Sequence, residues 1–189
     1  MNYTITEALT ALYPEARWVC RGDTYAGLEW LDKTQTKPTE QEIEEKIAEL
    51  NYQGEINVYQ EKRKLEYPNW EDQLDQIYHG GVDAWKVDIK AIKDKYPKQT
   101  MDATELQKRK DAAIFKVQKK NYEKAVARLA QYELSAGLTD DEGKHIIMPI
   151  AVEINGERNP LVVQDEAERD AAQQVINNTP QAVIESVNS

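Results

Sequence analysis

Residues 67–97 decide the fold of this chain, and they read YPNWEDQLDQIYHGGVDAWKVDIKAIKDKYP. A proline stands near each end, and two adjacent glycines divide the stretch at positions 80 and 81. Asn69 is a helix-capping residue type with Asp72 at its third position. Apolar side chains follow at helical spacing, namely Trp70, Leu74, Ile77 and Tyr78. This pattern predicts a helix that begins at about residue 70 and is broken at Gly80-Gly81.

A second apolar stripe follows the glycines at steps of three, four, three and four, formed by Val82, Trp85, Ile89, Ile92 and Tyr96. That spacing keeps all five side chains on one face of a helix. Pro97 ends the pattern, because proline disfavours helical backbone in the residue before it. The stretch therefore predicts a hairpin of two helices joined by Gly80-Gly81.

The preceding segment predicts a long helix that starts with a capping box. Thr39 follows Pro38 and has Glu42 three residues on. A narrow apolar stripe comes next, formed by Ile43, Ile47 and Leu50, and the helix must end before Tyr67-Pro68. Gly54 weakens or bends it. A stripe this narrow suits pairing with a like helix in a coiled coil, or packing on the chain's own domain.

The N-terminal residues predict a short helix and a β-hairpin. Residues 5–12 are amphipathic and stop at Tyr13-Pro14. Residues 16–21 and 28–31 are aromatic or β-branched runs on either side of a loop with Arg21-Gly22-Asp23, which predicts two antiparallel strands. As a turn element, that triplet needs no role in adhesion.

Downstream of the hairpin, Asp102 and Glu105 predict the start of a helix of roughly thirty residues that ends by Gly137. Its expected apolar face is formed by Phe115, Tyr122, Val126, Leu129 and Tyr132. Residues 146–154 predict a strand, in which Pro149 implies an edge position or a bulge. Asn155-Gly156 predicts a hairpin turn, and residues 161–163 predict the returning strand. Asp165 is expected to cap one further helix and Thr179-Pro180 to start the last.

The fold class expected from these elements is α+β and mainly helical. It combines a small N-terminal β-hairpin, a helical hairpin, long helices, and a C-terminal β-hairpin with two short helices. Composition shifts divide the sequence into a small α/β module (1–37), a long helix plus the helical hairpin (38–98), a long basic helix (99–138) and a C-terminal α/β module (139–189).

Charge is unevenly spread along the 189 residues, whose net charge is −10. Residues 1–85 carry −9, residues 86–128 carry +7, and residues 139–189 carry −7. The basic block suits contacts with other segments or another subunit, or forms a solvated lysine-rich helix face. The overall negative charge argues against nucleic acid as a partner. No apolar run is long enough to span a membrane, and the start lacks the pattern of a secretory signal.

The residues that carry chemistry are scarce. Cys20 is the only cysteine, which leaves a small buried thiol as its expected role, and the two histidines are His79 and His145. No serine stands in a nucleophile-elbow context and no glycine-rich phosphate loop is present. One alternative is a weak metal site at a helix end, formed by Asp75, His79 and Asp83. In the competing interpretation, His79 caps the helix or forms an ordinary hydrogen bond. We therefore expect no enzyme activity and no catalytic, cofactor-binding or metal-binding residues.

Two stretches carry a resemblance to a known family. The first holds Leu12-Tyr13-Pro14, Trp18-Val19, Arg21-Gly22-Asp23-Thr24-Tyr25, Gly27-Leu28-Glu29-Trp30 and Lys37-Pro38-Thr39-Glu40. The second holds Tyr67-Pro68, Asp72-Gln73-Leu74-Asp75, Tyr78-His79-Gly80-Gly81, Trp85 and Lys95-Tyr96-Pro97. Together they resemble small tail-associated proteins of tailed bacteriophages, often grouped with tail-fibre assembly proteins or fibre chaperones. The resemblance covers about residues 5–98.

The resemblance implies a protein that binds tail-fibre or baseplate subunits, in the bacterial host cytoplasm during assembly or in the virion tail. Family members often end near the Lys-Tyr-Pro, whereas this chain continues for about ninety residues. The extension suits a fibre-binding module of a chaperone or marks a permanent virion component. Self-association as a helical scaffold is a further alternative. Aromatic residues supply the candidate partner-binding anchors, which are Trp18, Tyr25, Trp30, Trp70, Tyr78 and Trp85.

Overall fold

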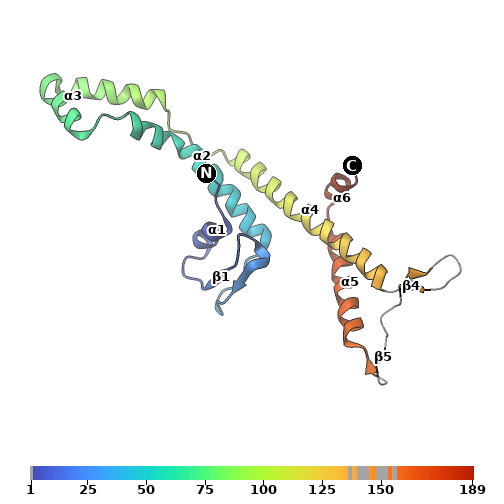
Figure 1. Cartoon of the computed structure of the whole chain (residues 1–189). Helices are drawn as coiled ribbons and strands as arrows, with labels where there is room; N and C mark the ends of the chain where they lie inside the picture. Colours follow the sequence, from blue (N-terminus) through green and yellow to red (C-terminus); the bar gives the residue numbers. More distant parts are fainter. Residues whose placement is uncertain (1, 136–137, 140–144, 148–152, 155–156) are drawn as a thin grey trace. The chain divides into compact units, whose positions relative to one another are not determined.

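The computed structural model describes the chain except residues 1, 136–137, 140–144, 148–152 and 155–156 (Figure 1). The described residues are mainly helical with short antiparallel strand pairs, which confirms the expected α+β class. They group into two compact units, residues 1–113 and 114–189, which are described separately below. The division of the sequence into four segments stays a prediction.

The N-terminal part of the first unit has the predicted helix and hairpin. Helix α1 spans Ile5–Leu12, and strands β1 (Trp18–Cys20) and β2 (Leu28–Trp30) pair antiparallel with Val19 opposite Glu29. A turn of 3-10 helix, η1 (Tyr25–Gly27), lies in the loop between them. The core of this module is formed by Ile5, Ala8, Leu9, Leu28 and Ile43.

Helix α2 (Glu40–Glu66) begins at the predicted capping box. The Thr39 hydroxyl accepts a hydrogen bond from the Glu42 amide at 3.2 Å, and the Glu42 carboxylate accepts one from the Thr39 amide at 2.7 Å. Ile43 is buried in the N-terminal core, and Ile47 and Leu50 pack against it. The narrow stripe therefore lies on the chain's own domain, and the helix continues through Gly54 to its predicted end.

Helix α3 (Trp70–Lys95) is the predicted helical hairpin. Asn69 caps it by accepting a hydrogen bond from the Asp72 amide at 2.8 Å. Gly81 interrupts it with φ +76° and ψ 167°, a conformation that residues with a Cβ rarely adopt. Trp85 Nε1 donates to the Gln73 side chain at 3.0 Å, although twelve residues of straight helix would span about 18 Å. The helix therefore bends back on itself at the glycines, as Figure 1 shows.

Helix α4 (Ala103–Ser135) begins in the first unit at the predicted Asp102 cap. The Asp102 amide also donates to the hydroxyl of the buried Tyr52 at 3.1 Å. Arg109 pairs with Glu55 of α2 at 2.8 Å, and Lys110 pairs with Glu49 at 3.5 Å. Part of the basic block thus contacts the acidic segment of the same chain.

The second unit has a small core. Tyr122, on the predicted apolar face of α4, is buried, but Phe115 and Val126 are exposed. Among the described residues of this unit, Val117, Ala125, Ala172 and Val183 are also buried. Arg128 Nε donates to Glu168 at 2.9 Å, and its other end pairs with Asp165. Helix α6 (Gln181–Asn188) follows Thr179-Pro180 as predicted, and its Ser186 carbonyl accepts from Lys119 of α4 at 3.1 Å.

Two short strand pairs lie in the described part of the second unit. β3 (Leu138–Thr139) pairs with β4 (His145–Ile147), and β5 (Glu153–Ile154) pairs with β6 (Glu157–Arg158), all antiparallel. β5 and β6 lie on either side of the predicted turn residues, and Glu153 is opposite Arg158. Pro149 and Asn155-Gly156 themselves lie outside the described residues.

The predicted returning strand at 161–163 and the Asp165 cap are wrong. Helix α5 spans Pro160–Asn178 and contains both. The buried Asn159 caps it by accepting from the Leu161 amide at 3.0 Å, and Pro160 occupies the first turn. This Asn-Pro start outweighs the strand preference of Leu161-Val162-Val163, because proline is pre-organised for the first helical position.

Gly27 provides a test of the β-hairpin. A Cβ at this position would lie 2.0 Å from the Arg21 carbonyl oxygen, a backbone atom. We expect Gly27→Ala to lower the free energy of unfolding by about 2 kcal/mol, since overpacking has effects of this size. Urea unfolding followed by tryptophan fluorescence measures it.

The control for this substitution is Gly22→Asn. Gly22 has φ +75°, but a Cβ there would meet no atom within 4 Å, and asparagine tolerates that backbone conformation. We expect a loss of about 1 kcal/mol or less. Equal losses in the two variants would contradict the close contact at Gly27.

Candidate functional site: an exposed helical hairpin

The most unusual feature of the first unit is that none of the residues of α3, all of which are described, is buried. Trp70, Leu74 and Tyr78 recur every fourth residue, with exposed fractions of 67%, 53% and 84%. Val82 and Val87, beyond the glycines, are also exposed. Contiguous exposed apolar side chains of this kind mark surfaces at which proteins associate.

The structure separates the six predicted anchor residues into two groups. Trp18, Tyr25 and Trp30 pack against the N-terminal core. The Tyr25 hydroxyl donates to the Pro38 carbonyl at 3.0 Å, and burial, with smaller effects of Glu40 and Glu42, raises the pKa of Tyr25. Trp30 Nε1 donates to the Gln35 carbonyl at 2.8 Å. These three side chains have structural contacts, and partner binding by them stays a prediction.

The other three anchor residues lie on α3. Trp85 is half-buried between the two arms of the hairpin, where it donates to Gln73. Trp70 and Tyr78 are exposed on the first arm, and they are the anchors that the structure leaves accessible. Sequence reasoning missed Val87 as part of this surface, because it lies outside the regular stripe after the glycines.

The charges of the two arms differ. The first arm (residues 69–79) carries Glu71, Asp72 and Asp75 and no lysine or arginine. The second arm and the residues after it (82–98) carry five lysines and three aspartates. Exposed pairs within the second arm, such as Lys86 with Asp83 at 3.5 Å and Lys90 with Asp94, contribute little to stability.

The end of α3 is held to α2 by a group of polar contacts that we call the clasp, formed by Arg63, Glu66, Lys95 and Tyr96. Arg63 donates from Nε to the Tyr96 carbonyl at 2.8 Å and from its terminal nitrogen to the Lys93 carbonyl at 3.0 Å. The Glu66 carboxylate accepts from Lys95 and from the Tyr96 hydroxyl, each at 2.5 Å. These contacts determine where the second arm lies on α2.

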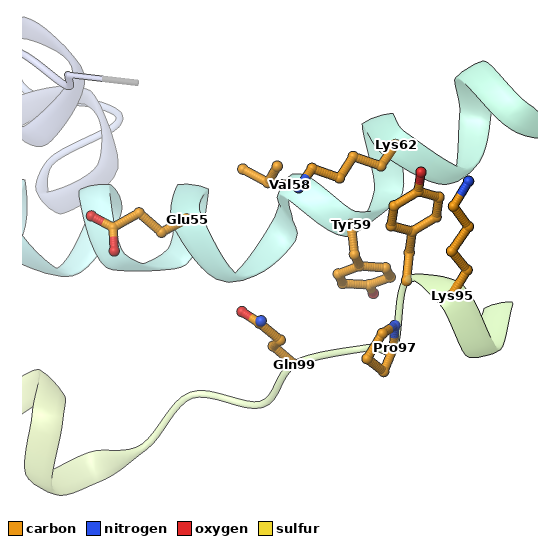
Figure 2. A pocket seen from close by; sticks show the side chains of 8 residues that line it. Glu55, Val58, Tyr59, Lys62, Lys95, Pro97 and Gln99 are labelled. Atoms are coloured by element: carbon orange, nitrogen blue, oxygen red, sulfur yellow. The ribbon is translucent and has the colours of Figure 1, made fainter. Parts of the chain in front are cut away.

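A pocket of about 370 Å³ lies beside the clasp. In Figure 2, Tyr59 of α2 extends toward Pro97 and Gln99, which follow the end of α3. The remaining lining residues are Glu55, Val58, Lys62, Lys95 and Tyr96. Arg109 pairs with Glu55, and Glu66 pairs with Lys95, so most charges of the pocket already have partners.

The alternative metal site is not assembled. His79 Nε2 lies 3.3 Å from Asp75 Oδ1, with both side chains exposed, whereas Asp83 pairs with Lys86. Among the described residues, no group of three or more histidine, cysteine, aspartate or glutamate side chains is arranged to hold a metal ion. Cys20 is half-buried, and its Sγ lies 3.0 Å from the Gly22 carbonyl oxygen.

Comparison with known proteins adds no relative: no family model, curated protein or solved structure matches the chain. Within the described residues, no helix has both the length and the apolar character needed to cross a bilayer. The chemistry of the surface itself is therefore the basis for a functional proposal.

Removing the Arg63 side chain tests the clasp. Arg63→Ala deletes two hydrogen bonds from a charged donor, a type that contributes about 1.5–3 kcal/mol when it is lost. We expect hydrogen exchange of the amides at 92–96 to rise while α1 and the N-terminal strands keep their protection. Lys64→Ala is the matched control, since Lys64 is an exposed neighbour on the same helix. Equal exchange in both variants would show that the clasp does not hold α3.

The clasp also predicts a dependence on pH. Hydrogen bonding from Lys95 and then Tyr96 lowers the pKa of Glu66, and the same bond to Glu66 raises the pKa of Lys95. A carboxylate with a lowered pKa stabilises the fold above its ordinary value of 4.5 and loses that effect as pH falls through its folded pKa.

We therefore expect exchange at the Tyr96 amide, corrected for intrinsic rates, to accelerate as the pH falls below the ordinary glutamate value. In the Glu66→Gln variant, exchange at the Tyr96 amide stays fast and changes little with pH. Glu61→Gln, an exposed neighbour, should behave like the original protein. The same pH profile in all three proteins would exclude Glu66 as the titrating group.

Proposed function

We propose that this protein is a non-enzymatic bacteriophage tail protein that binds tail-fibre or baseplate subunits, as an assembly chaperone or as a retained tail component. The observation that carries the proposal is the exposed apolar face of α3. Its anchors Trp70 and Tyr78 belong to residue types that dominate binding energy at protein interfaces. A face of this kind, lined by large side chains without a catalytic group, suits association with another protein.

The resemblance to phage tail proteins supports the kind of partner. The residues that carry it lie within about 5–98, all in the first unit, and include both arms of α3. The motifs Asp72-Gln73-Leu74-Asp75 and Tyr78-His79-Gly80-Gly81 contribute the cap, the exposed row and the turn. Motifs that carry the resemblance thus lie on the surface that we assign to binding.

Co-expression with the fibre and baseplate proteins encoded beside the gene tests this proposal. We expect the partner to co-purify, and the double variant Trp70→Ser/Tyr78→Ser to reduce recovery roughly tenfold or more, as interface anchors do. The control is Leu161→Ser, since Leu161 is a similarly exposed apolar residue of the second unit, with 62% of its surface accessible.

Absence of co-purification with every fibre and baseplate protein tested would refute the proposal. Loss of recovery in the control alone would move the binding surface to the second unit. Mass spectrometry of purified virions separates the two forms of the proposal. Near-stoichiometric recovery supports a retained tail component, and absence from the virion supports a chaperone.

A further inference from the structure

The exposed face of α3 has unpaired charge as well as apolar surface. Within the described residues, no lysine or arginine forms an ion pair with Glu71, Asp72 or Asp75, and the Asp75 carboxylate lies 3.3 Å from His79. On the second arm the side chain of Lys93 is likewise without a carboxylate partner in the described part of the chain; its backbone carbonyl is what Arg63 binds. Each arm therefore has charges that the other arm of the same hairpin does not neutralise.

The chemistry of this surface indicates which kind of partner covers it. It must present apolar side chains to Trp70, Leu74 and Tyr78, and it must carry cations at the edge of that contact, opposite the acidic arm. The second arm of α3 has this chemistry, because Val82 and Val87 are exposed and Lys93 has no carboxylate partner in the part of the chain that the structure describes. Within the described residues, Lys86 and Lys90 add cations that pair only with exposed aspartates of their own arm, Asp83 and Asp94.

We propose that, in the free protein, a second copy of the chain covers this face, with α3 against α3 and the acidic arm of each copy on the basic arm of the other. A two-fold axis makes both contacts at once, since the same patch serves on each subunit. The two hairpins then place four helical arms side by side, which is the arrangement of a four-helix bundle. The exposed row of one copy gains the apolar cover that its own unit does not provide.

This pairing does not depend on the identity of the fibre or baseplate partner. It concerns the face that we assign to binding, so such a subunit must displace the second copy in order to bind. Self-association and subunit binding are measured separately. A protein that is a monomer leaves the proposed function standing, and a dimer that binds no tail protein refutes the proposed function alone.

Sedimentation equilibrium over a wide range of concentration tests the mass. The expected result is a species of twice the chain mass of 21.7 kDa that dissociates on dilution. Leu74→Lys/Tyr78→Lys should give a monomer, and the control Leu161→Lys should remain a dimer. Circular dichroism confirms that helix content is retained in each variant.

Charge exchange tests which arms meet. Asp72→Lys/Asp75→Lys (the acidic-arm variant) and Lys90→Glu/Lys93→Glu (the basic-arm variant) each place like charges together in their own dimers. Each should raise the dissociation constant roughly tenfold or more, because like charges at an interface are strongly unfavourable. An equal mixture of the two should form a heterodimer, since both contacts then join opposite charges.

Three results would overturn the proposal. The first is a monomer at every concentration. The second is a dimer that none of the α3 variants weakens, which would place self-association elsewhere on the chain. The third is two weakened variants that stay monomeric when mixed, which would exclude the antiparallel pairing of acidic and basic arms. Because the charge variants change only exposed residues, they test the pairing even if the apolar variant fails to fold.

Discussion

The burial of Ile43 against Ala8 and Leu9 is the contact on which the first unit depends. It anchors α2 to the N-terminal module, and Ile47 and Leu50 extend the contact along the helix. Beyond Leu50, Tyr52 is the last buried residue of α2, and α3 has none. The hydrophobic core therefore supports one half of α2, and the remainder of the unit must be held by other means.

A helix cap, a glycine turn and a few polar contacts hold that remainder. Asn69 starts α3, Gly81 turns it with a backbone conformation that few other residues accept, and Arg63 binds the carbonyls at its end. These contacts define a backbone path, but they remove little apolar surface from water. Since apolar burial is the main favourable contribution to folding, a hairpin built in this way gains further stability by associating. The same feature explains both the marginal packing of α3 and its suitability for binding.

Local chemistry is the part of this fold that was predictable from the sequence. Capping at Thr39 and Asn69, the break at Gly80-Gly81 and the stops before Pro68 and Pro97 are each determined by residues adjacent in sequence. The error at 161–163 has the same origin. Branched side chains favour a strand there, but Asn159 and Pro160 start a helix two residues earlier, and the start signal prevails.

Burial was less predictable, because periodicity shows that a helix has an apolar face but not what covers it. The stripe Ile43, Ile47 and Leu50 and the row Trp70, Leu74 and Tyr78 both recur at helical steps of three or four residues. The first is covered by α1 and the strands, and the second is open. Similarly, Trp30 and Trp70 are both aromatic residues near a turn. Tertiary contacts alone pack Trp30 against the core and leave Trp70 accessible.

An open face that two partners share also has a thermodynamic consequence. If a second copy and a tail subunit both cover α3, the subunit binds only the fraction of the protein that is monomeric. Its apparent dissociation constant then equals the intrinsic one divided by that fraction. In such a system, self-association covers the apolar face while partners are scarce, and a stronger dimer weakens the apparent binding of the subunit more. A dimer that is weak enough to dissociate at the concentration of the partner satisfies both requirements, and a hairpin joined by exposed ion pairs and a few apolar side chains is suited to that range.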